Sequence, residues 1–231
     1  MRERSEDVGS AGAGGRAGVR IEASSNTGSG DVAGLRDDSG SCDDVDHARA
    51  TLYMLLAQLL ARAPSATLLR DLAGLKGDAT PLGLAQLALA DAARGTEATA
   101  IATEYLNLFI GVGRGELLPY ASFYRTGFLH ERPLAEVRQD MAKLGLERQE
   151  SVFEPEDHIS SLFEIMAGLA SGSFAAPPKA ADRFFERHIA PWAPRLMADL
   201  ATSPSSHFYK HVARLGAVWI EIEQEALALP E

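Results

Sequence analysis

Residues 154–169, EPEDHISSLFEIMAGL, give the clearest helix signal in the chain. Their large apolar side chains recur at the spacing of one buried helix face: Ile159, Leu162, Phe163, Met166 and Leu169. Pro155 is favoured at the first helical position, because its missing N–H group would have no intrahelical partner there. The pattern therefore predicts a buried amphipathic helix that begins at Pro155 and ends near Ser171-Gly172.

Negative charge collects at the start of this expected helix. Glu154, Glu156 and Asp157 would lie in or beside the first turn, where free N–H groups and the helix dipole favour carboxylates. His158 follows them directly. One interpretation is an ordinary capped helix with a hydrogen-bonded histidine. The other is a site at an accessible surface for a positively charged ligand.

The composition of the 231-residue chain excludes several kinds of partner. Hydrophobic residues make up 46%, enough for a sizeable core, and no run of about 18 apolar residues predicts a membrane span. The formal net charge of −10 argues against nucleic acid, which binds clusters of Lys and Arg. A single cysteine, Cys42, cannot form an internal disulfide or a cysteine-ligated metal site. We expect a soluble protein of a reducing compartment.

The first 43 residues differ in kind from the rest. They hold 9 of the 21 glycines and no aromatic residue, so they cannot bury enough apolar surface to offset the entropy of ordering. They contain no apolar core of a secretory signal, and Glu3 separates Arg2 from Arg4. We expect a disordered tail over 1–43 and a folded region over 44–231.

The folded region predicts further helices punctuated by Pro and Gly. Ser65 begins one, and Thr80-Pro81 is an N-cap followed by a first-turn proline. Helices are expected over about 43–63, 65–76, 81–94, 96–109, 133–144 and 155–171, around Phe184–Ile189 and Leu196–Leu200, and over about 205–227. No alternating strand pattern and no internal repeat is present. The sequence predicts an all-α fold of roughly nine helices in one globular domain, with two helical lobes as the alternative.

The segment 110–124, IGVGRGELLPYASFY, is the least regular part of this region. Its glycines resemble a phosphate-binding loop, but a helix is expected before them and Pro119 follows, where a dinucleotide site needs a strand and then a helix. Nucleotide binding is therefore a minor hypothesis. Tyr120, Phe123 and Tyr124 are expected either to pack on the core or to form the wall of a groove.

The sequence leaves two catalytic alternatives to binding. Glu154 and His158, at i and i+4, can place two metal ligands on one helix face, but a usable site needs a third and no HExxH motif supplies it. No GxSxG motif marks an activated serine. An acidic helix start, nearby aromatics and a negative net charge favour binding of a basic, apolar peptide. A metal-dependent hydrolase that uses Glu154 and His158 is the alternative.

Four motifs together resemble the TorD/DmsD family of redox-enzyme maturation chaperones, relatives of NarJ. Glu154–His158 is similar to the family's E-P-x-D-H signature, and Tyr105–Gly111 to its Y/W-x-x-L-F-x-G. Pro119–Tyr124 is similar to P-Y-x-S-x-Y, and Phe184–Trp192 includes F-x-x-H-(L/I)-x-P-W. The four occur in the family's order. The chain departs from the family in having Tyr105 where Trp is also found, and in its long tail.

The resemblance implies an all-helical cytoplasmic chaperone without a cofactor of its own. It implies binding of the twin-arginine signal peptide or immature body of a molybdopterin-dependent oxidoreductase before export, and we lean toward a formate dehydrogenase. Weak GTP binding, and either a monomer or a helix-exchanged dimer, are also implied. The implied peptide- or client-binding residues are Tyr105, Leu108, Phe109, Tyr120, Glu154, Pro155, Asp157 and His158.

Overall fold

A computed structural model describes residues 39–149 and 152–229 and confirms the all-α fold. The helices are α1 (Ser39–Ala61), α2 (Ala66–Ala73), α3 (Pro81–Gly95), α4 (Ala98–Tyr105), the π-helix η1 (Leu106–Ile110), α5 (Ala121–Thr126), α6 (Arg132–Lys143), α7 (Ile159–Ala170), α8 (Ala180–His188), α9 (Ala193–Thr202) and α10 (Tyr209–Ala228). Within the described ranges, none of them combines the length and apolarity needed to span a bilayer.

Helix starts follow local capping chemistry where a polar cap is present. The Ser65 and Thr80 side chains accept the N–H groups of Leu68 and Gly83, as expected for N-caps of α2 and α3. Helix α1 begins at Ser39, so the start expected near Asp43 was placed too late. The rest of the expected tail, 1–38, lies outside the described residues.

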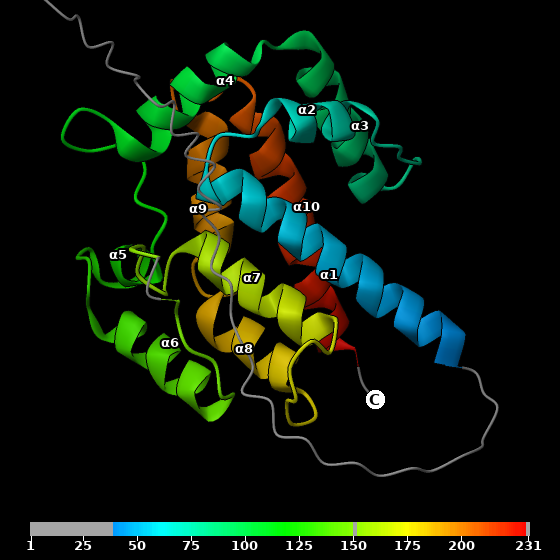
Figure 1. Ribbon diagram of the computed structural model, residues 1–231, viewed down its shortest axis with the longest axis vertical. Helices are drawn as coiled ribbons and strands as arrows, with labels where there is room; N and C mark the ends of the chain where they lie inside the picture. The colour runs from blue at the N-terminus through cyan, green and yellow to red at the C-terminus, as the bar shows by residue number, and fades with distance from the viewer. Residues whose placement is uncertain (1–38, 150–151, 230–231) are drawn as a thin grey trace, which may run out of the picture.

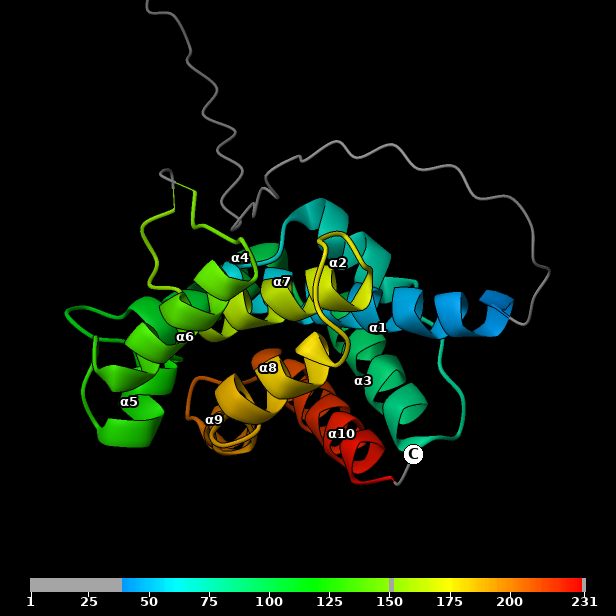
Figure 2. The ribbon, with the colours of Figure 1, turned by 90° about the horizontal axis from the view of Figure 1, so that it is seen from below.

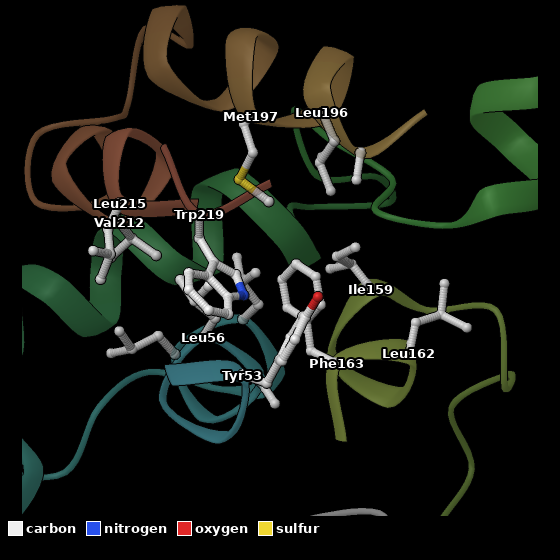
Figure 3. Packing of buried hydrophobic residues seen from close by; sticks show 14 of the residues in the cluster. Tyr53, Leu56, Ile159, Leu162, Phe163, Leu196, Met197, Val212, Leu215 and Trp219 are labelled. Atoms are coloured by element: carbon white, nitrogen blue, oxygen red, sulfur yellow. The ribbon is translucent and has the colours of Figure 1, made fainter. Parts of the chain in front are cut away.

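Helices α1 and α7 pack along each other at the centre of the molecule (Figure 1). Helices α8, α9 and α10 lie on one side of this pair (Figure 2). Helices α1, α7 and α10 meet in an aromatic cluster. Tyr53 of α1 lies 5.6 Å from Phe163 of α7 and 5.3 Å from Trp219 of α10, ring centroid to ring centroid (Figure 3). Full burial of one such ring contributes about 1.5–3 kcal/mol, so the apolar face of α7 holds the fold together.

Buried polar contacts tie α10 to α1. The Glu223 carboxylate receives two hydrogen bonds of 2.7 Å from the Arg49 guanidinium and one of 2.8 Å from the Tyr53 hydroxyl. Glu223 is 2% exposed, and burial followed by the nearby carboxylate raises the pKa of Tyr53. Both partners of the carboxylate are supplied by α1, so this contact fixes how the two helices face each other.

A second buried carboxylate caps the start of α10. Glu104, near the end of α4, accepts the N–H groups of His207, Phe208 and Tyr209 at 2.8, 2.9 and 2.7 Å. Phe208 and Tyr209 mark the beginning of α10, where the helix has free donors and a partial positive charge. The contact therefore joins the end of α4 to the start of α10.

Candidate functional site

Helix α7 begins at Ile159, so the expected start at Pro155 is wrong by four residues. The N-cap is His158, whose ring Nδ1 accepts the N–H of Ser160 at 3.2 Å and lies 2.6 Å from its hydroxyl oxygen. Pro155 instead stands in a turn closed by a bond from the His158 N–H to its carbonyl. The cause is a tertiary contact: the residues before the helix are paired with another segment.

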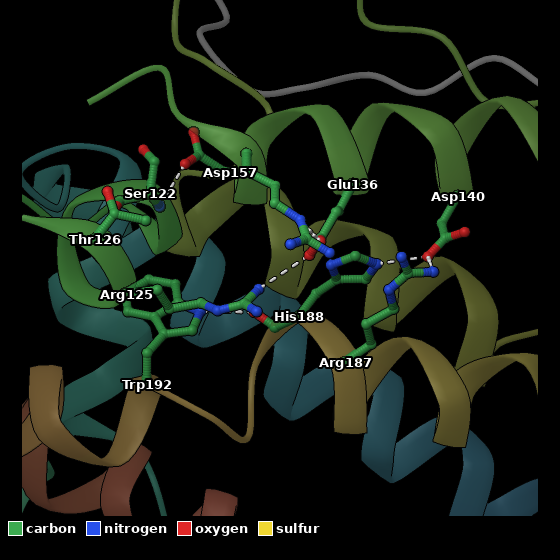
Figure 4. A network of polar contacts seen from close by, with 10 residues as sticks. Ser122, Arg125, Thr126, Glu136, Asp140, Asp157, Arg187, His188 and Trp192 are labelled. Carbon is green, nitrogen blue, oxygen red and sulfur yellow. Dashed lines mark hydrogen bonds and ion pairs between the residues drawn. The ribbon is translucent and has the colours of Figure 1, made fainter. Parts of the chain in front are cut away.

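That partner segment is the start of α5. The Asp157 carbonyl accepts the N–H of Ala121 at 3.0 Å, the Pro119 carbonyl accepts that of Ile159 at 2.9 Å, and an antiparallel bridge joins Tyr120 to His158. The Asp157 side chain adds a bond of 2.8 Å from the Ser122 N–H (Figure 4). Two motifs about 35 residues apart in sequence therefore form one rigid unit.

Two of the acidic residues expected at an accessible surface are instead committed to this framework. Asp157 is 1% exposed and caps α5 through Oδ2, while its Oδ1 has no hydrogen-bond partner among the described residues. Glu156 is 8% exposed and pairs with Arg138 at 2.9 Å and Arg148 at 3.3 Å. The expectation that Asp157 and Glu156 are available to a peptide's cations is corrected: neither carboxylate is open to solvent.

A π-helix follows α4 and was not expected from the sequence. In η1 the N–H of Gly111 bonds to the Leu106 carbonyl at 2.6 Å, one residue farther than in an α-helix. Gly111 has φ +63°, and a Cβ there would lie 2.0 Å from the Arg114 carbonyl oxygen. A Cβ at Gly115 would lie 2.5 Å from the backbone of Phe109. Chain packing thus explains both glycines, and no part of this geometry favours a nucleotide site.

The π-helix, the start of α5 and the start of α7 surround a cavity of about 280 Å³. Five of the eight candidate residues line it: Tyr105, Phe109, Tyr120, Glu154 and His158. The structure places the other three elsewhere: Leu108 is fully buried in the core, Pro155 lies in the turn before α7, and Asp157 caps α5. The remaining lining comes from Ala61, Ile110, Pro119, Val152, Phe153, Ser160, Ser161 and Glu164.

The cavity is negatively charged. Glu154 and Glu164 line it, and none of the described residues that line it is Lys or Arg. The Tyr120 hydroxyl donates a hydrogen bond to the Glu154 carboxylate, and burial, together with that contact, raises the pKa of Tyr120. Burial and the charge of Glu154 likewise raise the pKa of Tyr105 to about 12. The phenols of Tyr105 and Tyr120 therefore stay protonated and add no charge to the cavity.

Large apolar side chains are exposed at the edge of the cavity. Phe153 and Ile110 line it and are still 91% and 55% exposed. Leu106 and Val112, on the same π-helix and the loop after it, are also exposed. Exposed apolar residues that cluster around a concave site are typical of interaction surfaces. We call Ile110 and Phe153, which line the cavity and remain exposed, the apolar rim.

A second cavity of about 550 Å³ runs along α1 and α7. Its lining is mainly apolar or small: Ala50, Met54, Leu55, Ala167, Gly168 and Phe174, with His47, Thr51, Gln58, Ser171 and Ser173. Glu164 lines both cavities. The α1–α7 groove therefore begins where the acidic cavity ends.

Sequence reasoning missed Glu164 and Phe153, although each carried a signal. Glu164 is the one charged residue in α7, whose other residues are apolar or small. A charged side chain is rarely buried unless it has a partner or a function, so its position in this helix was a signal. Phe153 directly precedes the acidic motif, and the residues three and four positions before it, Glu150 and Gln149, are polar.

Burial keeps His158 neutral at physiological pH. Its pKa is lowered from 6.5 to about 4 by desolvation, against the opposing charges of Glu154 and Asp157. Because Nδ1 accepts the N–H of Ser160, the proton of the neutral ring resides on Nε2. The ring packs edge-on against Tyr120, with centroids 5.0 Å apart. His158 thus contributes a neutral wall and a single N–H donor.

This arrangement predicts a pH-dependent contribution of His158 to stability, which a His158→Asn variant removes. As the pH falls below 6.5 the unfolded chain binds the proton first, so the folded state loses about 2 kcal/mol between pH 7 and pH 5. Asn is also a favoured N-cap and does not titrate. Urea unfolding at both pH values should show wild type losing about 2 kcal/mol relative to the variant. The exposed His47→Asn control should shift by less than about 0.5 kcal/mol. If the free energy of unfolding fell by the same amount between pH 7 and pH 5 in wild type and in His158→Asn, the ring of His158 would be hydrated in the folded state.

Metal-dependent chemistry finds no support in this geometry. Within residues 39–149 and 152–229, no group of three or more His, Cys, Asp or Glu side chains is arranged to hold a metal ion. Glu154 lies in the turn before α7 and not on the helix, so it does not share a helix face with His158. The hydrolase alternative therefore lacks both its third ligand and the expected pairing of the first two.

Comparison with solved structures shows which all-helical fold the chain adopts. A crystal structure of a protein described as a redox enzyme maturation protein from Archaeoglobus fulgidus superimposes with a TM-score of 0.52 at 18% identity, covering 81% of this chain and 98% of that one. At this identity the likeness concerns the fold alone.

Sequence comparison gives the family. The model of the nitrate reductase delta subunit family matches residues 75–198. The chaperone protein TorD of Shewanella loihica is 28% identical over 205 residues, covering 79% of this chain and 94% of the relative; that of Shewanella oneidensis is 27% identical, covering 80% and 92%. The chain belongs to this NarJ/TorD-like family of redox-enzyme maturation chaperones, which are not enzymes.

Proposed function

We propose that this protein is a cytoplasmic chaperone of a molybdopterin-dependent oxidoreductase, and that it binds the enzyme's twin-arginine signal peptide or immature body before export. The observation that carries the proposal is the acidic cavity, where two carboxylates and a set of exposed apolar side chains meet. A twin-arginine leader combines the matching features, since its cations precede an apolar segment. The preference for a formate dehydrogenase client, weak GTP binding and a helix-exchanged dimer rest on the family resemblance alone.

The acidic cavity would hold the cations of the leader. Glu154 supplies a carboxylate that accepts charge-assisted hydrogen bonds from guanidinium groups, and Glu164 adds a second acidic side chain to the same lining. Tyr105 and Phe109, whose ring centroids lie 5.0 Å apart, present aromatic faces on which a guanidinium can stack. The surrounding carboxylates raise the rate of encounter with a basic peptide, and that rate should fall as salt is added.

The apolar segment of the leader would continue over the apolar rim or into the α1–α7 groove. Both begin at the acidic cavity, the rim through Phe153 and Ile110 and the groove through Glu164. Burying these exposed side chains would supply most of the binding free energy, because apolar area removed from water contributes about 25 cal/mol per Å². Asp157 and Pro155 would act by holding the cavity in shape, and Leu108 by supporting the π-helix from the core.

A double-mutant cycle tests the proposal. The probe is a synthetic leader with adjacent arginines and about a dozen apolar residues, compared with the same peptide carrying glutamines in place of both arginines. Glu154→Gln should weaken binding of the arginine peptide about tenfold and that of the glutamine peptide much less, because the lost contact is with a cation. Isothermal titration calorimetry on the full chain measures both.

The control for this cycle is Glu221→Gln, which removes the same charge from the exposed side of α10. It should leave both affinities within about twofold, since a distant exposed charge is screened at physiological salt. Equal losses from Glu154→Gln and Glu221→Gln would reduce the effect to net charge. The proposed function would be refuted if the full chain bound neither of the two peptides nor the cofactor-free client enzyme.

A further inference from the structure

A third cavity, of about 380 Å³, lies between α6 and α8. It is lined by the end of α6, by α8 from Ala180 to Arg187 and by Pro177 in the loop before α8, so it shares no lining residue with the acidic cavity around His158. Its size falls in the range of small-ligand sites in proteins, about 300–1,000 Å³. The proposed peptide binding makes no use of it.

The charge of this cavity is opposite to that of the chain. Lys143, Arg183 and Arg187 line it against one carboxylate, Asp140, which leaves two positive charges. The whole chain has a formal net charge of −10. Cations gathered at a concave site in an acidic protein are not explained by solubility, because scattered surface charge would serve that purpose.

Asp140 organises two of the three cations. Its carboxylate receives hydrogen bonds of 2.7 Å from Lys143 and 2.8 Å from Arg187. The buried His188 ring adds a contact of 2.8 Å through Nε2 to the same oxygen as Arg187 (Figure 4). A single carboxylate shared among these partners positions the ammonium and guanidinium groups and does not neutralise them. Arg183, on the exposed side of α8, supplies the third cation.

The rest of the lining is apolar. Leu144, Pro177 and Phe184 form part of the wall, and Phe184 is only 3% exposed, so its ring is held firmly by the core. A site that combines a fixed apolar wall with cations at its opening suits a ligand with an anionic head and an apolar body. Simple surface ion pairing would not require the wall.

We propose that the α6–α8 cavity binds a small organic phosphate. A phosphate monoester carries a charge of about −1.5 to −2 at pH 7, which matches the two net positive charges of the cavity, whereas a monocarboxylate would leave one of them unmatched. Arginine side chains bind phosphate oxygens in a two-pronged geometry, and two of the three cations are arginines. The organic part of the ligand lies against Phe184 and Leu144.

The contributions of the cations and of the apolar wall can be separated by comparing three ligands: phenyl phosphate, inorganic phosphate and phenol. Titration of the full chain, followed by two-dimensional NMR and calorimetry, should show saturable binding of phenyl phosphate. Inorganic phosphate should bind about tenfold more weakly because it leaves the apolar wall unused, and phenol should show no saturation. Shifted resonances should come from α6 and α8. Benzoate should bind more weakly than phenyl phosphate because it carries a single charge.

Variants then assign the binding to the cavity. Arg183→Gln and Lys143→Gln, both at exposed positions, should each weaken phenyl phosphate about fivefold, whereas Lys210→Gln on the exposed face of α10 should change it by less than about twofold. Glu154→Gln, which tests the peptide cavity, should leave phenyl phosphate binding unchanged. Equal effects of the three cation variants, no saturable binding, or resonance shifts confined to the acidic cavity would each overturn the proposal.

Discussion

Replacing Glu104 by Ala should lower the free energy of unfolding by about 3–5 kcal/mol. The carboxylate accepts three backbone N–H groups at the start of α10 and is 6% exposed, so its removal leaves buried donors without a partner. The same change removes a negative charge from the positive end of a 20-residue helix. Urea unfolding followed by circular dichroism measures the loss.

This change should also reach the candidate site. Tyr209, whose N–H is capped by Glu104, packs against Tyr105 and Phe109 with ring centroids 5.9 and 5.5 Å away. Loosening the start of α10 therefore loosens the aromatic wall of the acidic cavity. Glu97→Ala is the matched control, because it precedes the same helix α4 but its side chain makes no cap hydrogen bond. It should cost less than about 0.5 kcal/mol. Similar losses for the two variants would contradict the assigned role of Glu104.

Two substitutions of Asp157 should have opposite outcomes. Asp157→Ala removes the acceptor of the Ser122 N–H and should cost about 2 kcal/mol. It should also weaken leader binding at least about tenfold, because the start of α5 carries Tyr120 into the cavity. Asp157→Asn retains an oxygen acceptor and removes a buried charge, so stability should change by less than about 1 kcal/mol. Affinity for the arginine peptide should stay within about threefold of wild type.

The comparison separates a positioning role from direct contact with the client. If the Asp157 carboxylate paired with an arginine of the leader, Asn would lose as much affinity as Ala, because both lack the charge. The arginine and glutamine peptides used for Glu154 give a second readout. Asp157→Ala should weaken both peptides equally, whereas a direct ion pair would weaken only the arginine peptide.

The sequence predicted those parts of the fold that local chemistry determines. The starts of α2 and α3 were found because Ser65 and Thr80 cap their own helices, and Pro81 suits the first turn. The start of α7 was misplaced because Pro155 obeys the same local rule, while the hydrogen bonds to Pro119 and Ala121 override it. Those bonds join residues 40 and 36 positions apart in the chain, and no window of local sequence contains them.

The candidate site was predicted in part for a related reason. Motif resemblance identified five cavity residues, but it could not tell an inward carboxylate from an outward one. Glu154 lines the cavity, Glu156 pairs with two arginines and Asp157 caps a helix, although all three lie within four residues of each other. Glu164 was missed because it belongs to the face of α7 opposite the apolar stripe on which the helix was recognised.

The π-helix implies that the spacing of one segment of the chain is under a tight length constraint. A π-turn is an α-helical turn with one additional residue, so excising a single residue from Leu106–Ile110 would restore ordinary helical pitch. Every position beyond the excision would then rotate by about 100° around the helix axis. Phe109 would leave the cavity wall. The hydrogen bonds from the N–H groups of Glu116 and Leu117 to the carbonyls of Asn107 and Leu108 would also be lost. Homologues that keep the aromatic wall should therefore tolerate substitutions in this segment far more readily than deletions.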